Sequence, residues 1–330
     1  MPRRRIPAAC LAALTALLLT AGAAAAPGEF SVGVLRRDGV LIPFASFDGR
    51  VWEVAWPGAS ASILPISLAD VPRRWWGGVG PDAPWRAWIG EEPPQPLKLL
   101  KPVHVPIFCG GHLAIATDYR GEALTEREPT VPKDGIATAG DVTVLPITQV
   151  SVHAPDAARL IAAITERFNE EETLAVKTFT NWYHPFSSAQ RANTPIALEA
   201  FYRAVDTGAS GEFRTNYIEA VRKYPARFGD LGCGLITFVR GWVTEFRDKK
   251  PVINIGARVT YCDRADVSFM QPFGRVRLPR GSGRPGSAVY WIYQTSSWRD
   301  EFYSVVHVTE EAVRPMLVVA GGGCPREPAK

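Results

Sequence analysis

Apolar residues recur along this chain with two different periods, and the two periods predict different elements. Over most of the chain, short apolar runs alternate with clusters of Gly, Pro and Asp, which is typical of antiparallel β-structure. One segment, residues 156–169, instead places Leu160, Ile164 and Phe168 at helical spacing. The predicted fold class is therefore mainly β: antiparallel sheets in a sandwich or barrel-like arrangement, with one amphipathic covering helix.

The first half of the chain begins with a predicted meander. Its runs are residues 31–36, 40–47 and 51–56, and the dipeptides Asp38-Gly39 and Asp48-Gly49 separate them. Asp-Gly favours tight hairpin turns because both residues tolerate positive φ. Further strands are expected at residues 85–89, 97–100, 103–108 and 113–117. The polar stretch from residue 118 to residue 141 predicts a long loop.

The second half carries longer strand-like runs. They are residues 174–182, 197–205, 213–222, 235–246, 252–261, 267–270, 275–278, 288–293, 302–308 and 313–319. The turn-like break at residues 247–251 predicts that 235–246 and 252–261 form an antiparallel hairpin. An outer-membrane barrel uses similar strands, but the cysteines, the amphipathic helix, the uneven strand lengths and the polar tail disfavour it.

The charged run at residues 170–172 is where the predicted helix ends. The one candidate domain boundary lies near this helix. It separates a meander region at residues 27–154 from a helix-plus-strand region at residues 155–330. The two regions could also form one continuous domain. Residues 1–25 are expected to be a secretory signal peptide, because three arginines precede a short apolar run and a small-residue stretch, with cleavage near residues 23–25. Nothing downstream is long and apolar enough for a transmembrane helix. The mature chain is expected to be exported, to the periplasm or the exterior.

Composition and charge narrow the classes of partner. The chain is 46% hydrophobic and 21% charged, the balance of a folded globular protein. Removing Arg3, Arg4 and Arg5 with the signal peptide lowers the formal net charge from +4 to +1. A nearly neutral surface gives no reason to expect nucleic-acid binding, which depends on neutralising phosphates.

Four cysteines remain after export, and an even number in an oxidising compartment predicts disulfides. The predicted hairpin brings Cys233 and Cys262 close together, which leaves Cys109 to pair with Cys324. Metal binding by Cys109 and His112 is disfavoured, because no second Cys/His pair of that spacing exists. No metal and no cofactor are expected.

Strong catalytic signatures are absent from the sequence, including the Gly-x-Ser-x-Gly elbow and the His-Glu-x-x-His metal motif. Among scattered histidines, His184 is the best candidate because its aromatic neighbours could shift its pKa. Two acidic clusters, Asp263 with Asp266 and Asp300 with Glu301, could supply the paired carboxyls of a glycosidase. Both clusters fall where turns are predicted, and Asp favours turns for local hydrogen-bonding reasons.

Aromatic residues are the most suggestive feature, since the chain has ten Trp residues. Two clusters stand out as candidate platforms for sugar rings: Trp75, Trp76, Trp85 and Trp88 in the first half, and Trp291, Tyr293 and Trp298 in the second. The alternative is that these rings fill a core or brace Pro-rich loops. The favoured function is a non-catalytic binding or structural module that recognises a polysaccharide or another envelope component. The alternative is a secreted hydrolase that uses an acidic pair such as Asp300 and Glu301.

Overall fold

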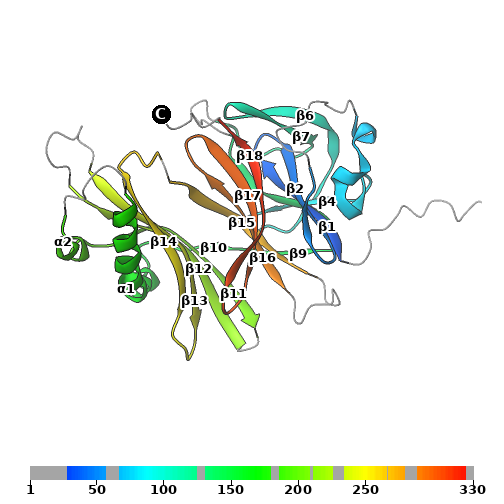
Figure 1. The fold of residues 1–330 in the computed structure, drawn as a ribbon. Helices are drawn as coiled ribbons and strands as arrows, with labels where there is room; N and C mark the ends of the chain where they lie inside the picture. The colour runs from blue at the N-terminus through cyan, green and yellow to red at the C-terminus, as the bar shows by residue number, and fades with distance from the viewer. Residues whose placement is uncertain are drawn as a thin grey trace, which may run out of the picture.

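A computed structural model describes residues 28–56, 67–124, 131–179, 186–208, 211–225, 234–265, 267–278 and 288–324 of the chain. Most of these residues lie in antiparallel strands, which form three sheets (Figure 1). One long helix lies on the outer side of the assembly. The predicted fold class, mainly β with one covering helix, is confirmed.

The first sheet contains eight strands and curls into a half-barrel. They are β1 (Glu29–Arg36), β2 (Val40–Asp48), β3 (Trp52–Val54), β4 (Trp85–Ile89), β5 (Gln95–Leu97), β6 (Leu99–Ile107), β7 (Gly110–Thr117) and β8 (Lys133–Gly140). Their order is β5-β4-β8-β1-β2-β7-β6, with β3 paired to β2. Lys98 alone separates the two end strands along the chain, which requires the sheet to curl. Two 3₁₀ helices, η3 (Leu68–Asp70) and η4 (Arg73–Val79), pack against its inner face.

The second and third sheets each contain five strands. The second is formed, in order, by β10 (Thr148–Gln149), β11 (Ala197–Gly208), β12 (Gly211–Lys223), β13 (Leu235–Phe246) and β14 (Val252–Tyr261). The third is formed, in order, by β18 (Val313–Gly323), β17 (Asp300–Val308), β16 (Val289–Ser296), β15 (Phe269–Arg277) and β9 (Thr143–Leu145). Strands β9 and β10 precede residue 155 but pair with strands that follow it, so strand pairing crosses the predicted domain boundary.

The third sheet is the middle layer, and the alternation of side chains on β16 shows why. Successive residues on a strand point to opposite faces. Tyr290 and Ile292 enter the core shared with the half-barrel, whereas Trp291 packs against Tyr217 and neighbouring residues of the second sheet. The other face of the second sheet is covered by the helix α1 (Pro155–Thr178), which packs against β11 and β14 (Figure 1).

The helix is longer than predicted, and this corrects two expectations. It runs 24 residues, through the charged segment 170–172 and into the strand expected at 174–182, which is therefore wrong over residues 174–178. Glu is a good helix former, so an acidic run need not end a helix. The buried positions Leu160, Ile164, Phe168, Glu172 and Ala175 continue at helical spacing across it.

The long loop expected at residues 118–141 is also corrected, because β8 occupies residues 133–140 and pairs with both β1 and β4. Its sequence, KDGIATAG, is rich in Ala and Gly, which have low strand propensity. A strand buried on both faces also lacks the alternation of polar and apolar residues that marks a half-exposed strand. Sequence patterning therefore could not detect it.

The predicted hairpins are confirmed. Strands β1, β2 and β3 form the expected meander, and Gly39 and Gly49 in the two turns have φ values of 84° and 92°. Strands β13 and β14 have the predicted bounds, with Leu235 opposite Tyr261. The runs 267–270 and 275–278 are not separate strands, since residues 269–270 and 275–277 both belong to β15, which continues through a bulge at Pro272/Gly274.

The predicted disulfide between Cys109 and Cys324 is confirmed, with a Cα–Cα distance of 4.7 Å. It ties the β6–β7 turn to the residue that follows β18. The predicted pair Cys233–Cys262 involves Cys233, which lies outside the described residues, as do His184, Asp266 and the predicted signal peptide. None of the helices in the described part of the chain combines the length and apolar character needed to cross a bilayer.

Candidate functional site

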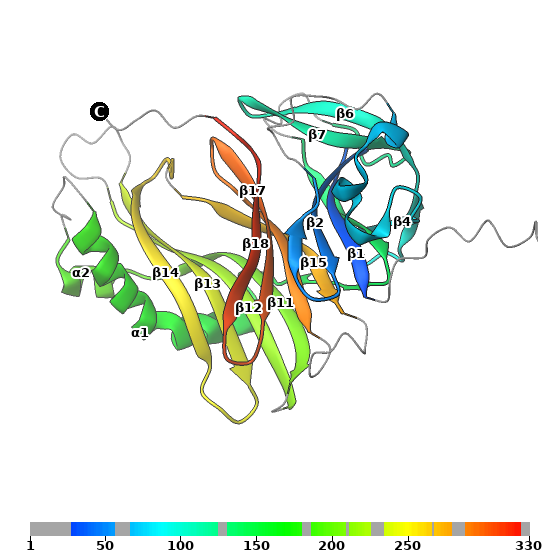
Figure 2. The same cartoon turned by 45° about the vertical axis from the view of Figure 1, so that its right-hand side comes forward.

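A hollow of about 600 Å³ opens on the concave face of the second sheet, and we call it the trough. Strands β13 and β14 extend beyond the β17–β18 hairpin on this side (Figure 2), and residues from β15, β16 and the β14–β15 connection close the other wall. Its volume lies within the range of about 300–1,000 Å³ that is common for small-molecule sites. The lining residues with polar or aromatic side chains that bear on function are Tyr217, Arg240, Trp242, Asn254, Arg258 and Tyr293.

Strand register brings these side chains together. Residues directly opposite each other on neighbouring strands share a face of the sheet, so each row across β12, β13 and β14 presents three side chains to the same side. Two successive rows on the trough side are Tyr217, Trp242 and Asn254, then Glu219, Arg240 and Gly256. Strands β12, β13 and β14 therefore place aromatic, cationic and amide groups on one concave surface.

The aromatic part of the trough is braced from behind. The ring of Trp242 meets that of the buried Trp291 edge to face at 4.8 Å between centroids, and that of Tyr217 at 5.2 Å. Tyr293 is half-buried and lies 6.4 Å from Trp242. Such T-shaped arrangements suit the quadrupoles of the rings. The packing holds Trp242 and Tyr293 in fixed positions at the wall of the trough.

A buried carboxyl, Glu219, lies at the base of this cluster. It is 4% exposed and accepts hydrogen bonds from the Met270 backbone N–H at 2.7 Å and from the Tyr217 hydroxyl at 3.1 Å. Burial raises the pKa of Glu219 above its ordinary range, and burial likewise raises the pKa of Tyr217 and of Tyr293. Both hydroxyls therefore keep their protons, and the proton of Tyr217 is already donated to Glu219.

The cationic part of the trough is open to solvent. Arg240 is exposed, and its Nη1 donates to the Ser268 carbonyl oxygen at 2.7 Å. Opposite Arg240 on β14 stands Gly256, where an added Cβ would meet no atom within 4 Å. The hollow beside Arg240 exists because this position of the strand carries no side chain.

The arrangement is suited to binding more than to hydrolysis. Glycoside hydrolysis requires two carboxyl groups on either side of the scissile bond. No Asp or Glu is among the described residues that line the trough, and Glu219 lies beneath Tyr217. The exposed side chains of the trough are those of Arg240, Asn254 and Arg258, and the half-buried ring of Tyr293 lies beside them. Trp242 is 9% exposed and supports this surface from below.

The first predicted aromatic cluster is divided between two cores, because Trp75, Trp76 and Trp85 pack inside the half-barrel and Trp88 packs against the core shared with the third sheet. Trp76 and Trp85 are 1% and 2% exposed, and Trp75 and Trp88 are half-buried. Within the half-barrel the buried Trp56 packs edge to face against both Trp75 and Trp76. These rings therefore form no open platform on the surface.

The second predicted aromatic group is divided among three environments. Trp291 is fully buried behind Trp242, Tyr293 lines the trough, and Trp298 is 65% exposed in the turn between β16 and β17. Of the seven aromatic residues proposed from the sequence, Tyr293 is the one among the trough-lining residues.

The two predicted acidic residues Asp300 and Glu301 are consecutive on β17 and therefore point to opposite faces. Asp300 accepts a hydrogen bond from the Ser297 hydroxyl in the preceding turn. Glu301 is fully buried, pairs with Lys133 Nζ at 2.6 Å and accepts a hydrogen bond from the Tyr303 hydroxyl. Both carboxylate oxygens of Glu301 thus have partners, and the group lies buried between the half-barrel and the third sheet. Asp263, of the other acidic pair, lies in an exposed turn.

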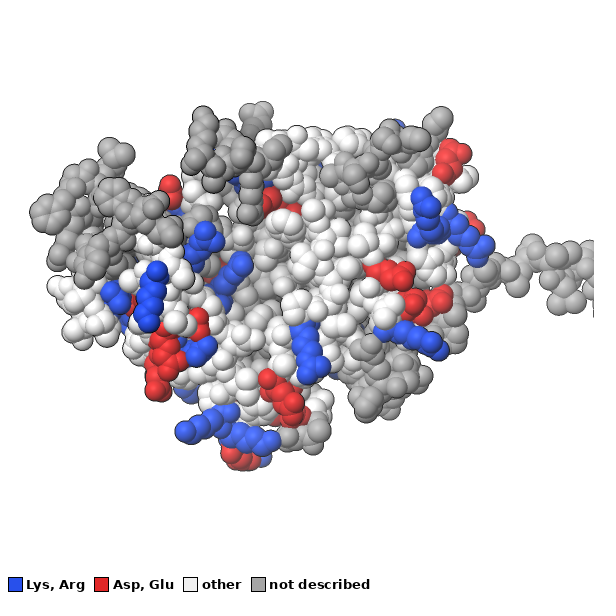
Figure 3. Space-filling model, viewed as in Figure 1, with Lys and Arg blue, Asp and Glu red and all other residues white. Residues whose placement is uncertain are grey.

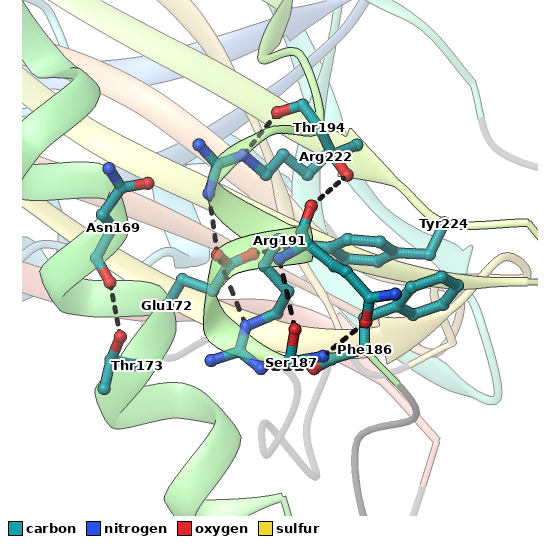
Figure 4. A network of polar contacts seen from close by, with 10 residues as sticks. Asn169, Glu172, Thr173, Phe186, Ser187, Arg191, Thr194, Arg222 and Tyr224 are labelled. Atoms are coloured by element: carbon teal, nitrogen blue, oxygen red, sulfur yellow. Dashed lines mark hydrogen bonds and ion pairs between the residues drawn. The ribbon is translucent and has the colours of Figure 1, made fainter.

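A second polar cluster lies on the helix side of the second sheet (Figure 4). Glu172 of α1 accepts hydrogen bonds from Arg222 Nη1 at 2.8 Å and from the Tyr224 hydroxyl at 2.5 Å. Arg191 of the short helix α2 (Ser188–Ala192) lies 3.7 Å from the same carboxylate and donates to the Phe186 carbonyl oxygen. All these side chains are buried, so the cluster anchors both helices to the sheet.

Sequence reasoning missed Tyr217, Glu219, Arg240, Asn254 and Gly256. A signal existed, because Tyr217 with Glu219, and Arg240 with Trp242, are polar or aromatic residues two positions apart in predicted strands. Combined with the predicted hairpin register, this would have placed Arg240 and Trp242 beside residues 254–256. The position of β12 next to β13 was the missing step.

Neither the charges on the face shown in Figure 3 nor the possible metal ligands among the described residues indicate another site. Basic and acidic side chains are intermixed on the face shown in Figure 3, without a large area of one sign. The described residues contain no group of three or more His, Cys, Asp or Glu side chains placed to hold a metal ion. Comparison of the chain with protein-family models, with curated proteins and with solved structures finds no match.

Proposed function

We propose that this chain is an exported, non-catalytic binding protein whose trough takes a saccharide. The observation that carries the proposal is the trough itself, an open hollow bordered by a braced aromatic wall and by exposed polar donors. Sugar rings present apolar faces that stack on aromatic side chains and hydroxyl groups that accept hydrogen bonds. Tyr293 of β16, whose ring lies beside the buried Trp242, would supply the aromatic contact, and Asn254 of β14 and Arg240 of β13 would supply the polar ones.

A filling substitution tests the proposal directly. Gly256→Phe should place a ring in the hollow, because an added Cβ at this position meets no atom within 4 Å. Retention of the purified protein on a panel of polysaccharides should be lost in this variant. The matched control is Val318→Phe, which adds a ring at an exposed position of β18 that does not line the trough. Equal retention of both variants, or no retention of the wild type, would refute the proposal.

A hydrolase is the second candidate, and Glu219 is the observation that favours it. A buried carboxyl with a raised pKa can act as a general acid. Glu219→Gln distinguishes the two functions, because a binding protein should release no reducing ends from a bound polysaccharide either before or after this substitution. Release by the wild type that disappears in Glu219→Gln would assign hydrolysis.

A further inference from the structure

A second hollow, of about 330 Å³, opens between α1 and α2 on the helix side of the second sheet. The exposed residues Thr173, Ser188 and Ala192 line its rim. At its base lie Glu172 and Arg191, which are 2% and 7% exposed. The volume is near the lower end of the range of about 300–1,000 Å³ that is common for small-molecule sites. The hollow therefore offers room for a small ligand beside the buried polar cluster.

The cluster at the base of the hollow carries more positive than negative charge. The guanidinium groups of Arg191 and Arg222 share the carboxylate of Glu172, and neither arginine pairs with another carboxylate among the described residues. Tyr224 adds no charge, because burial raises the pKa of its hydroxyl, which stays protonated. One positive charge is thus uncompensated where water is largely excluded, and an uncompensated buried charge is costly.

Arg191 is the residue whose charge is left over. Arg222 and the Tyr224 hydroxyl already donate to the two oxygens of Glu172 (Figure 4). The Nε of Arg191 lies 3.7 Å from this carboxylate, beyond hydrogen-bond distance, and is buried without an acceptor among the described residues. Its guanidinium group makes one hydrogen bond to them, from Nη1 to the Phe186 carbonyl oxygen at 2.7 Å. Buried arginines are normally paired, so most of the five donors of this group lack the acceptor that burial calls for.

The rest of the hollow is compatible with an anion. Glu172 is the one acidic residue among the described residues that line it, and both of its oxygens have partners. The exposed hydroxyl of Ser188 can donate to the same ligand. The planar fork of a guanidinium group matches two oxygens of a carboxylate or phosphate.

We propose that the hollow between α1 and α2 binds a small oxyanion, a phosphate or carboxylate group, through Arg191. The anion offsets the positive charge that Glu172 leaves uncompensated, and Ser188 adds a second contact from α2. This site lies on the helix side of the second sheet, whereas the trough lies on the other side, so the proposal does not depend on saccharide binding.

Titration calorimetry of the purified protein with inorganic phosphate and with acetate tests the proposal, at an ionic strength fixed with sodium chloride. At least one probe should bind saturably, and the tighter one identifies the group as phosphate or carboxylate. Arg191→Gln should weaken that binding at least about tenfold, because it removes charge-assisted hydrogen bonds. The control is Arg167→Gln, an exposed arginine of α1 that does not line the hollow, and its binding should be unchanged. Absence of saturable binding by both probes, or equal binding by the wild type and Arg191→Gln, would overturn the proposal.

A variant at the rim makes the test independent of the buried cluster. Ala192→Glu, at an exposed position, places a competing carboxylate in the same hollow and should weaken binding of the tighter probe at least about tenfold through charge repulsion. Ala192→Gln adds a side chain of nearly the same shape without the charge, and it should bind more tightly than Ala192→Glu. Thermal melting checks that both variants fold. Unchanged binding in a folded Ala192→Glu variant would place the anion elsewhere and overturn the assignment.

Discussion

The inside of the half-barrel and the concave face of the second sheet both carry aromatic side chains, but they use them differently. In the half-barrel, Trp56, Trp76 and Trp85 pack against one another and against apolar residues of several strands, and they are almost fully buried. On the second sheet, Trp242 packs against Trp291 and Tyr217, while the rows beyond it carry Arg240, Asn254 and Gly256. Tryptophan content alone therefore does not identify a binding surface.

The difference follows from what covers each face. A curled sheet encloses its inner face, which η3, η4 and the indole rings fill. The second sheet is stabilised on its convex face by α1, and the third sheet covers only part of its concave face. The uncovered part can carry polar side chains at low cost because they remain in contact with water.

The largest expected effect is the loss of an indole ring from the half-barrel. Trp76→Ala should lower the free energy of unfolding by about 3–5 kcal/mol, the usual cost of removing a buried Trp side chain. Urea denaturation followed by circular dichroism measures it. Trp298→Ala, at a 65% exposed site, is the control and should change stability by less than about 0.5 kcal/mol. Similar small losses in both variants would contradict a packed half-barrel.

The second largest loss of stability is expected when the buried cluster around Glu172, which holds α1 on the convex face, is broken. Glu172→Gln should lower the free energy of unfolding by about 3 kcal/mol, because Arg222 and Arg191 would lose the carboxylate between them. Glu170→Gln, at an exposed position of the same helix that pairs with Arg167, should cost less than about 0.5 kcal/mol. Comparable losses from the two substitutions would show that the buried cluster does not anchor the helix.

A change of pH should alter the free energy of unfolding in opposite directions through one titratable group in each region. In the half-barrel that group is His112. Burial lowers the pKa of His112, whose Nδ1 donates to the Leu113 carbonyl oxygen in the neutral ring. The unfolded chain therefore binds a proton more readily below about pH 6.5. Relative to His112→Gln, the wild type should lose stability as the pH falls from about 7 to about 5.

On the second sheet the titratable group is Glu219. Because its pKa is raised, the free energy of unfolding should change with pH in the opposite direction. The folded state holds this proton more tightly than the unfolded chain, so its contribution is complete below the ordinary Glu value of about 4.3. Relative to Glu219→Gln, the wild type should lose stability as the pH rises from about 4 to about 7. Urea titrations at several pH values measure both dependences, and slopes of the same sign for the two pairs would refute this contrast.

The smallest expected effect on stability is at the trough. Gly256→Phe should change the free energy of unfolding by less than about 0.5 kcal/mol, since an added Cβ meets no atom within 4 Å, the position is exposed and Gly is a poor strand former. Thermal melting of the variant beside the wild type measures it. A loss above about 2 kcal/mol would mean that this face of β14 is more tightly packed than the hollow implies.

Local chemistry in the sequence was enough to predict much of the strand content. Asp-Gly dipeptides predicted the β1–β3 meander, and alternation with a turn-like break predicted both bounds of β13 and β14. The pairing of Cys109 with Cys324 followed from counting cysteines and from that hairpin. These features depend on residues that are close in sequence, or on a covalent rule that leaves few choices.

Only the tertiary structure decided which aromatic residues are buried and which strands form the trough. The position of β8 and the full length of α1 depend on burial against strands that are distant in sequence. The local periodicity of apolar residues does not show such burial. Likewise, Arg240 meets Tyr293 only because the second and third sheets pack face to face over Trp242 and Trp291. The physical reason is that side-chain alternation specifies two faces for each strand, whereas contacts between sheets determine which face is filled and which stays open to a ligand.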